Sequence, residues 1–196
     1  MPQQLGGTTN IVNFEADFVI DTIDRLAVPR SGTNLSLHWF SARESYGSDV
    51  ALDALTLDFL KPISWGKNTL LPWWSLGSTT KGTSADLQPF SLGGLFDLSG
   101  YAPEELDGKH VSIGRLLYYR QLGDQALPFF DTPIYVGGSV EVGNVWGDTS
   151  EVSLSNSLTA GSVFIVFDSI FGPLYLAYGT AEGGRKSAYL FLGQTF

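Results

Sequence analysis

The chain has 196 residues and a formal net charge of −9, and only 16% of its residues are charged. A soluble globular domain usually carries about 25% charged residues, so the composition argues against an ordinary solvated surface, and a hydrophobic content of 43% excludes a disordered chain. The acidic balance, with no basic stripe, argues against nucleic acid as a partner.

No stretch approaches the roughly 18 apolar residues of a membrane-spanning helix, but alternating strands of about ten residues also span membranes. Residues 1–7 show neither the basic nor the apolar region of a secretory signal. If the chain belongs to an outer membrane, we therefore expect it to be a fragment or a mature segment.

The first predicted strand covers residues 11–21, where apolar and polar side chains alternate. Val12, Phe14, Ala16, Phe18 and Ile20 form one set, and the other set is mostly acidic or amide. A strand places these two sets on opposite faces, whereas a helix would mix them. The same two-residue alternation recurs in residues 133–143.

Eight more strands follow a turn at residues 24–32. They are predicted near residues 33–44, 50–60, 69–78, 109–122, 132–143, 159–168, 174–180 and 186–196. Residues 79–108, between the strands predicted near residues 69–78 and 109–122, contain glycine and proline and show little periodicity. We expect a long loop there, and a single domain over residues 1–196.

The fold class is therefore all-β, and two environments remain open for it. A soluble sandwich shows the same alternation. Three features favour an antiparallel transmembrane β-barrel: a small, neutral or acidic polar face, strands longer than the usual five or six residues, and aromatic residues near strand ends, as in interfacial girdles. These aromatic residues are Trp39, Phe40, Trp65, Trp73, Trp74, Phe129, Phe130, Trp146, Phe171 and Phe196.

Several motifs make the chain similar to a known superfamily. The ending Y-L-F-L-G-Q-T-F, with Leu190, Leu192 and Phe196, resembles the signal read by the outer-membrane assembly machinery. The D-S-I-F-G-P-L sequence at residues 168–174 and the D-x-x-x-x-P-x-x-G turn at residues 24–32 also resemble motifs of the bacterial surface antigen superfamily. These barrels assemble or translocate other proteins. The alternative interpretation is that Phe196 only ends the last strand and is not an assembly signal.

Residues 114–120 and 138–146 look closest to one branch, the barrels of patatin-like phospholipase type V autotransporters. The resemblance implies that residues 1–196 form about nine strands, the C-terminal portion of a larger, roughly sixteen-stranded barrel in the bacterial outer membrane. Its implied partners are outer-membrane lipid, the assembly machinery and the N-terminal remainder of the barrel. Its implied function is to export or display an N-terminal patatin-like phospholipase passenger.

The resemblance also implies a site inside the barrel. In the superfamily an Arg-Gly-aromatic loop tip folds inward and meets a carboxylate on the lumen wall. Here Ser99, Gly100 and Tyr101 occupy the tip, so serine replaces the arginine, and Glu141 matches the wall carboxylate. We expect a hydrogen bond from Ser99 to Glu141, weaker than the charge-assisted pair, and docking that depends on Tyr101.

Arg115 or Arg120 is expected to lie beside Glu141 on the lumen wall and to keep it ionised by pairing. The alternative interpretations are an ordinary Ser-Gly-Tyr turn and a lumen carboxylate without a partner. If the chain instead closes on itself, it is a stand-alone structural or porin-like barrel.

Enzymatic chemistry is not expected in this chain. It has no G-x-S-x-G nucleophile elbow and no glycine-rich phosphate loop before a helix. The two histidines, His38 and His110, have no zinc-site spacing and no cysteine to join them. We expect no metal and no cofactor, and any lipase activity of a longer protein is expected outside these residues.

Overall fold

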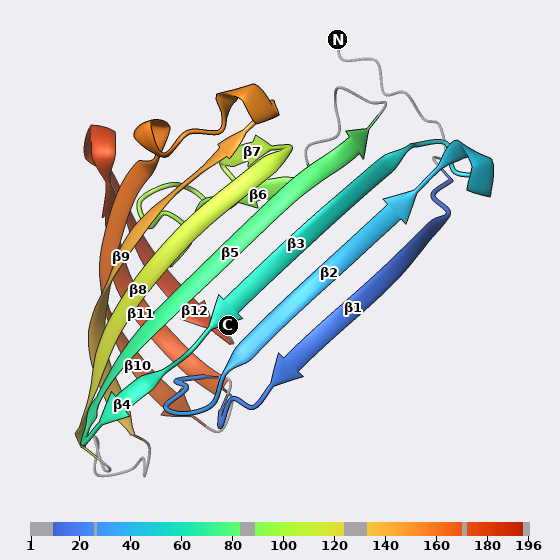
Figure 1. The fold of residues 1–196 in the computed structure, drawn as a ribbon. Helices are drawn as coiled ribbons and strands as arrows, with labels where there is room; N and C mark the ends of the chain where they lie inside the picture. The colour runs from blue at the N-terminus through green and yellow to red at the C-terminus, as the bar shows by residue number, and fades with distance from the viewer. Residues whose placement is uncertain (1–9, 26, 83–88, 124–132, 170–171, 194–196) are drawn as a thin grey trace.

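A computed structural model of the chain describes residues 10–25, 27–82, 89–123, 133–169 and 172–193 (Figure 1). The described residues form an all-β structure, which confirms the predicted fold class. The long strands are β1 (Asn13–Asp21), β2 (Asn34–Ala42), β3 (Leu52–Leu60), β5 (Asn68–Gly82), β8 (His110–Gly123), β9 (Ile134–Trp146), β10 (Leu158–Ser169), β11 (Gly172–Ala181) and β12 (Arg185–Leu192).

Three short strands complete the set: β4 (Ile63–Trp65), β6 (Phe90–Leu92) and β7 (Leu106–Gly108). Single 3-10 turns lie at Glu44–Tyr46, Thr149–Glu151, Leu154–Asn156 and Glu182–Gly184. Across the described ranges, no helix is long and apolar enough to cross a membrane.

The long strands pair in the order β1-β2-β3-β5-β8-β9-β10-β11-β12, with β4 paired to β5 alone. Every pair is antiparallel. The sheet curls strongly (Figure 1). Its two edge strands are β1 and β12, which do not pair with each other in the part of the chain described.

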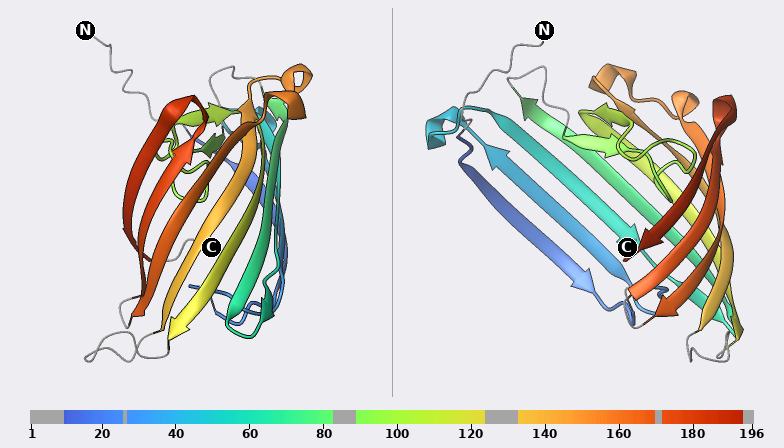
Figure 2. Two further views of the ribbon diagram at one scale, coloured as in Figure 1. Left: turned by 90° about the vertical axis from the view of Figure 1, so that its left-hand side faces the viewer. Right: turned by 180° about the vertical axis from the view of Figure 1, so that it is seen from behind.

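The hairpin of β6 and β7 belongs to a second, two-stranded sheet. It lies inside the curve of the large sheet, together with the irregular chain that joins its strands (Figure 2). We call residues 89–109 the inner loop. The segment predicted as a loop at residues 79–108 therefore starts later, because β5 extends to Gly82, and it contains this small hairpin.

Many side chains on the outside of the curve are apolar and exposed. They include Phe18, Trp74, Leu116, Val140, Val163, Leu176 and Leu190, which we call the outer face. The registry explains their position: Val140 lies opposite Leu116, and the next residue, Glu141, lies opposite Arg115 on the other face. The alternation predicted for the first and sixth long strands assigns the same residues to the same faces.

The inner face carries the buried residues and packs on the inner loop. One apolar cluster contains Val28, Leu60, Leu71, Phe96, Leu117, Tyr119, Tyr135, Phe164, Val166 and Tyr175. A second contains Leu92, Leu98, Tyr101, Ile113, Ala160 and Ala181. Both clusters contain residues of the inner loop and of the sheet, so the hydrophobic core of this structure lies within the curve.

Candidate functional site

The inner loop has an unusual backbone. Among the described residues, three that are not glycine have positive φ, namely Phe96 at 66°, Leu98 at 72° and Glu104 at 54°, and all three lie in this loop. Such conformations each cost of order 1–3 kcal/mol and persist only when surrounding contacts hold them. The loop is therefore held by specific contacts with the inner face.

Glu141 on β9 is the first of these contacts, and its side chain is completely buried. Ser99 donates its backbone amide to Oε2 of Glu141 at 2.6 Å and its hydroxyl to Oε1 at 2.7 Å. Ser139, two residues earlier on the same face of β9, donates its hydroxyl to Oε1 at 2.5 Å. The carboxylate thus receives three hydrogen bonds, which offset part of the cost of its burial.

Arg115, opposite Glu141 on β8, also contacts the inner loop. Its Nε donates to the carbonyl of Phe96 at 2.6 Å, and its guanidinium forms an ion pair with Asp97. A third nitrogen donates to Ser75 Oγ at 2.8 Å, and the guanidinium lies 3.9 Å from the centroid of Trp73. The planar fork of arginine suits this set of partners.

The loop tip reaches the last described strand, β12. The Gly100 amide donates to the Tyr189 hydroxyl at 2.8 Å, and that hydroxyl donates to the carbonyl of Tyr101 at 3.2 Å. Gly100 has φ of 116°, and a Cβ there would lie 2.7 Å from the backbone nitrogen of Ala181. Only glycine fits this close approach without displacement.

Arg185, at the start of β12, holds the far side of the tip. It forms an ion pair with Glu105, and its guanidinium lies 4.3 Å from the centroid of the Tyr101 ring. The backbone amide of Ala102 and then Arg185 hold the pKa of the Glu105 carboxyl below its usual value. The buried side chain of Tyr101 packs with Leu98, Ile113 and other residues of its cluster.

A second segment enters the curve from the opposite end, between β1 and β2. We call residues 22–25 and 27–33 the β1–β2 connection. The Asp24 carboxylate accepts the amides of Arg30 at 2.8 Å and Ser31 at 3.1 Å, which closes the segment on itself. Partial burial raises the pKa of Asp24, but these amides and Arg25 outweigh it, and the net pKa is lowered.

Three tyrosine hydroxyls from distant strands bind this connection. Tyr119 on β8 donates to the carbonyl of Pro29, and Tyr175 on β11 donates to the carbonyl of Ala27 at 2.6 Å. Arg25 donates to the hydroxyl of Tyr135 on β9 at 3.4 Å. The connection therefore reaches from the β1 edge of the sheet across the curve to β11, the strand next to the opposite edge, which a simple turn would not do.

The structure brings five of the predicted site residues together. Ser99, Gly100 and Tyr101 lie on the inner loop, with Glu141 and Arg115 on the facing strands. The expected hydrogen bond from Ser99 to Glu141 is present and is doubled by the amide. Arg115, however, pairs with Asp97 and not with Glu141 as expected.

Arg120 was the other arginine expected as a partner of Glu141, and the structure places it elsewhere. It is exposed and lies opposite Val136, whereas Glu141 lies opposite Arg115. Five positions separate Arg115 from Arg120, so on a regular strand they face opposite sides. The sequence alone therefore indicated that Arg115 and Arg120 could not both face Glu141.

Of the predicted assembly signal, Leu190 and Leu192 are exposed on β12, and Phe196 lies outside the described residues. Sequence reasoning missed Asp97, Arg185 and Tyr189 as partners of the inner loop. For Tyr189 a signal existed, because it shares its strand face with Ser187, away from Leu190. Asp97 lies in a loop without periodicity, so the sequence does not indicate the direction of its side chain.

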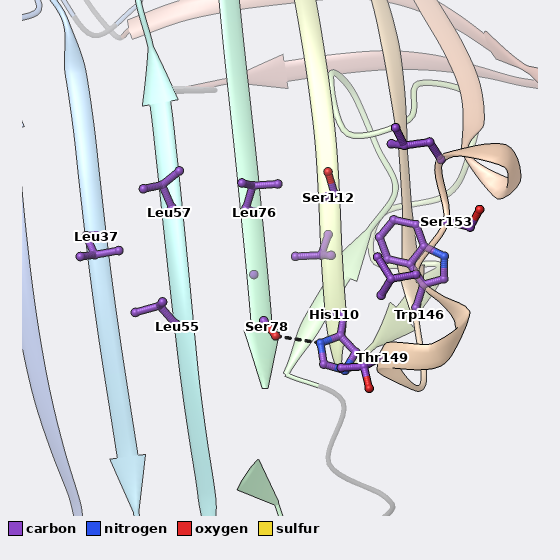
Figure 3. A pocket seen from close by; sticks show the side chains of 14 residues that line it. Leu37, Leu55, Leu57, Leu76, Ser78, His110, Ser112, Trp146, Thr149 and Ser153 are labelled. Carbon is purple, nitrogen blue, oxygen red and sulfur yellow. Dashed lines mark hydrogen bonds between the residues drawn. The ribbon is translucent and has the colours of Figure 1, made fainter. Parts of the chain in front are cut away.

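A groove of about 750 Å³ lies on the outer side, near the end of β5 and the start of β8 (Figure 3). Leucines 37, 55, 57 and 76 project into it from three neighbouring strands, and Val152 and Leu154 line it from the β9–β10 loop. His110 and Ser78 share a hydrogen bond of 2.9 Å at its edge. The groove is thus an indentation of the apolar outer face.

No group of three or more histidine, cysteine, aspartate or glutamate side chains with metal-binding geometry occurs among the described residues. Comparison of the sequence with protein-family models gives no match. A search of curated proteins also finds no similar protein.

Proposed function

We propose that this chain forms part of a bacterial outer-membrane β-barrel that anchors or translocates an N-terminal passenger. One observation carries the proposal: the curved sheet exposes apolar side chains outward, and its buried charged side chains Glu141 and Arg115 face inward. Val140 is 58% exposed, whereas its neighbour Glu141 is fully buried. Apolar surface exposed to water costs about 25 cal/mol per Å². An apolar outer face is favourable when lipid surrounds the sheet.

The strand lengths support the same proposal. β5 has 15 residues, β8 has 14 and β9 has 13. A tilted strand needs about 9–11 residues to cross the hydrocarbon core of a bilayer, so these strands are long enough. Trp65 and Trp74 on the same side of the sheet supply rings of the kind found at membrane interfaces.

Strand direction supports an N-terminal remainder over a stand-alone barrel. Since nine strands pair antiparallel in sequence, the two edge strands β1 and β12 run in the same direction. Joining them directly would create a parallel pair, whereas outer-membrane barrels are antiparallel with an even strand number. Closure therefore requires an odd number of further strands.

The docked inner loop supports a role in translocation, because the resemblance to the bacterial surface antigen superfamily places such a loop at the site of transport. The passenger class that the resemblance implies is a patatin-like phospholipase. Hydrolysis would then belong to the passenger, and this chain would supply the anchor and pathway, assembled by the outer-membrane machinery.

Cell fractionation tests the proposal with the natural gene product that contains these residues. We expect the polypeptide in the outer-membrane fraction, resistant to carbonate extraction, and any passenger to become accessible to added protease on intact cells. Recovery of the polypeptide in the soluble fraction would contradict the membrane assignment. A membrane-embedded protein whose passenger stays protected would contradict only the translocation role.

The neighbours Trp73 and Trp74 allow a test of orientation at one depth. Trp74 is exposed on the outer face, and Trp73 lies under the Arg115 guanidinium inside the curve. In vesicles of brominated phosphatidylcholine, a variant that keeps only Trp74 should lose most of its fluorescence, and one that keeps only Trp73 should lose little. Equal quenching of the two would contradict a lipid-facing outer side.

A further inference from the structure

We infer that the inner loop and the β1–β2 connection form one two-part plug, and that Tyr175 joins the two parts. This inference depends on contacts within the chain and does not require the membrane proposal. The two segments enter the curve of the sheet from opposite ends and are separated by more than 50 residues in the sequence.

Tyr175 is 1% exposed and contacts both parts directly. Its hydroxyl donates to the carbonyl of Ala27 in the β1–β2 connection at 2.6 Å. Its ring meets the Phe96 ring of the inner loop edge-on, with centroids 6.1 Å apart. The same ring lies 6.2 Å from the Phe191 ring on β12. One side chain therefore holds a polar contact to one part and an aromatic contact to the other.

The two parts also share one apolar cluster. Val28 from the connection and Phe96 from the inner loop pack in the same cluster with Tyr119, Tyr135 and Tyr175. Phe96 has a second edge-on contact, at 5.1 Å, with Phe164 of β10. Protein interiors are close-packed, so departure of either part removes packing contacts from the side chains that hold the other.

Each part has its own fixed end away from this joint. Asp24 closes the connection through two backbone amides, and Glu141 holds the inner loop through Ser99. Each part can therefore keep its local structure while its contact with Tyr175 is lost. The plug thus acts as a coupled device: release of one part weakens the seating of the other, and the inner face opens when both leave together.

Hydrogen exchange of the full chain in detergent micelles tests this coupling. Tyr175→Phe removes only the hydroxyl that binds the connection and keeps the ring on Phe96. We expect exchange in residues 23–33 to rise about fivefold, the size of one net hydrogen bond. The coupling further predicts a rise of at least about twofold in residues 95–102, which lie outside the segment that this hydrogen bond joins.

The reverse experiment uses Phe96→Leu, which removes the aromatic contact from the inner loop and leaves the hydroxyl bond to Ala27. Because coupling between two sites is reciprocal, exchange must then rise in residues 23–33 as well as in the loop. Tyr178→Phe is the matched control, since Tyr178 is on the same strand but exposed on the outer face. If each variant changes only its own segment, the two parts are independent and the inference is overturned.

Discussion

Ser99 and Glu141 form a neutral-to-charged contact in which serine donates both its amide and its hydroxyl to one carboxylate, at 2.6 and 2.7 Å. The five ion pairs among the described residues do not include Glu141. Hydrogen bonds to a charged group are worth about 1.5–3 kcal/mol each. The carboxylate therefore holds the loop tip without the arginine that the resemblance would supply.

Glu141→Gln should destabilise the chain by about 1–3 kcal/mol. The side-chain amide would keep one oxygen for the hydroxyls of Ser99 and Ser139, but its nitrogen would face the Ser99 amide, donor against donor. Denaturant unfolding measures the change. Glu182→Gln, at an exposed position in a 3-10 turn, is the control and should stay within about 0.5 kcal/mol. Equal stability of the two variants would contradict the role assigned to Glu141.

Gly100→Ala should displace the loop tip, because the new Cβ would meet the backbone of Ala181 at 2.7 Å. We expect a loss of about 2 kcal/mol or more and faster proteolysis within the inner loop. Gly47→Ala separates strain from collision: Gly47 also has positive φ, but nothing lies within 4 Å of its Cβ position. It should cost only the strain, about 1–2 kcal/mol, and leave loop proteolysis unchanged.

Arg115→Lys should weaken loop docking although it keeps the charge. A lysine ammonium cannot bind the Phe96 carbonyl, Asp97 and Ser75 in the geometry of the guanidinium fork. We expect a loss of about 2 kcal/mol in denaturant unfolding and faster loop proteolysis. The exposed Arg120 gives the comparison: Arg120→Lys should change neither measurement. If Arg115→Lys changed neither stability nor proteolysis, the positive charge alone would be enough to hold the loop.

The strands could be predicted because their information is local. Alternation in residues such as Phe14, Phe18, Val140 and Glu141 assigns each side chain to a face, and the turns between strands are rich in glycine and proline. The end of β5 was predicted four residues too early, at residue 78. Its extension to Gly82 depends on pairing with β3 through a register shift near Asp53, which is a tertiary effect.

The site was predictable where a motif marked it and not where contacts were purely tertiary. The resemblance selected Ser99, Gly100 and Glu141, which the structure brings together. Nothing local indicates that the β1–β2 connection reaches Tyr175, 148 positions beyond Ala27. That contact exists because the sheet curls, and the curl is a property of the whole nine-stranded sheet that accumulates from the twist between neighbouring strands.

The β1–β2 connection should lose stability at acidic pH through Asp24. Its pKa is lowered in the folded chain, mainly because the Arg30 and Ser31 amides outweigh the opposing effect of burial. A lowered folded pKa means that the contribution is complete above the ordinary value of about 3.9 and disappears as the pH falls through the folded pKa. Asp24→Asn should therefore be less stable than the parent at pH 7, and the difference should vanish once the pH lies below the lowered pKa of Asp24 in the folded chain. A difference independent of pH would contradict this role of the charge.

A charge on the outer face distinguishes lipid from water as the surroundings of the sheet. Val140 is 58% exposed in the middle of β9, and Leu122 is 57% exposed near the end of β8. In a bilayer, Val140→Arg should cost about 2–4 kcal/mol, and Leu122→Arg about 0–1 kcal/mol, because the penalty falls toward the interface. In a soluble sheet, both exposed positions would accept arginine within about 0.5 kcal/mol. Unfolding titrations of the two variants in vesicles measure the difference, and its absence would count against a membrane-facing outer side.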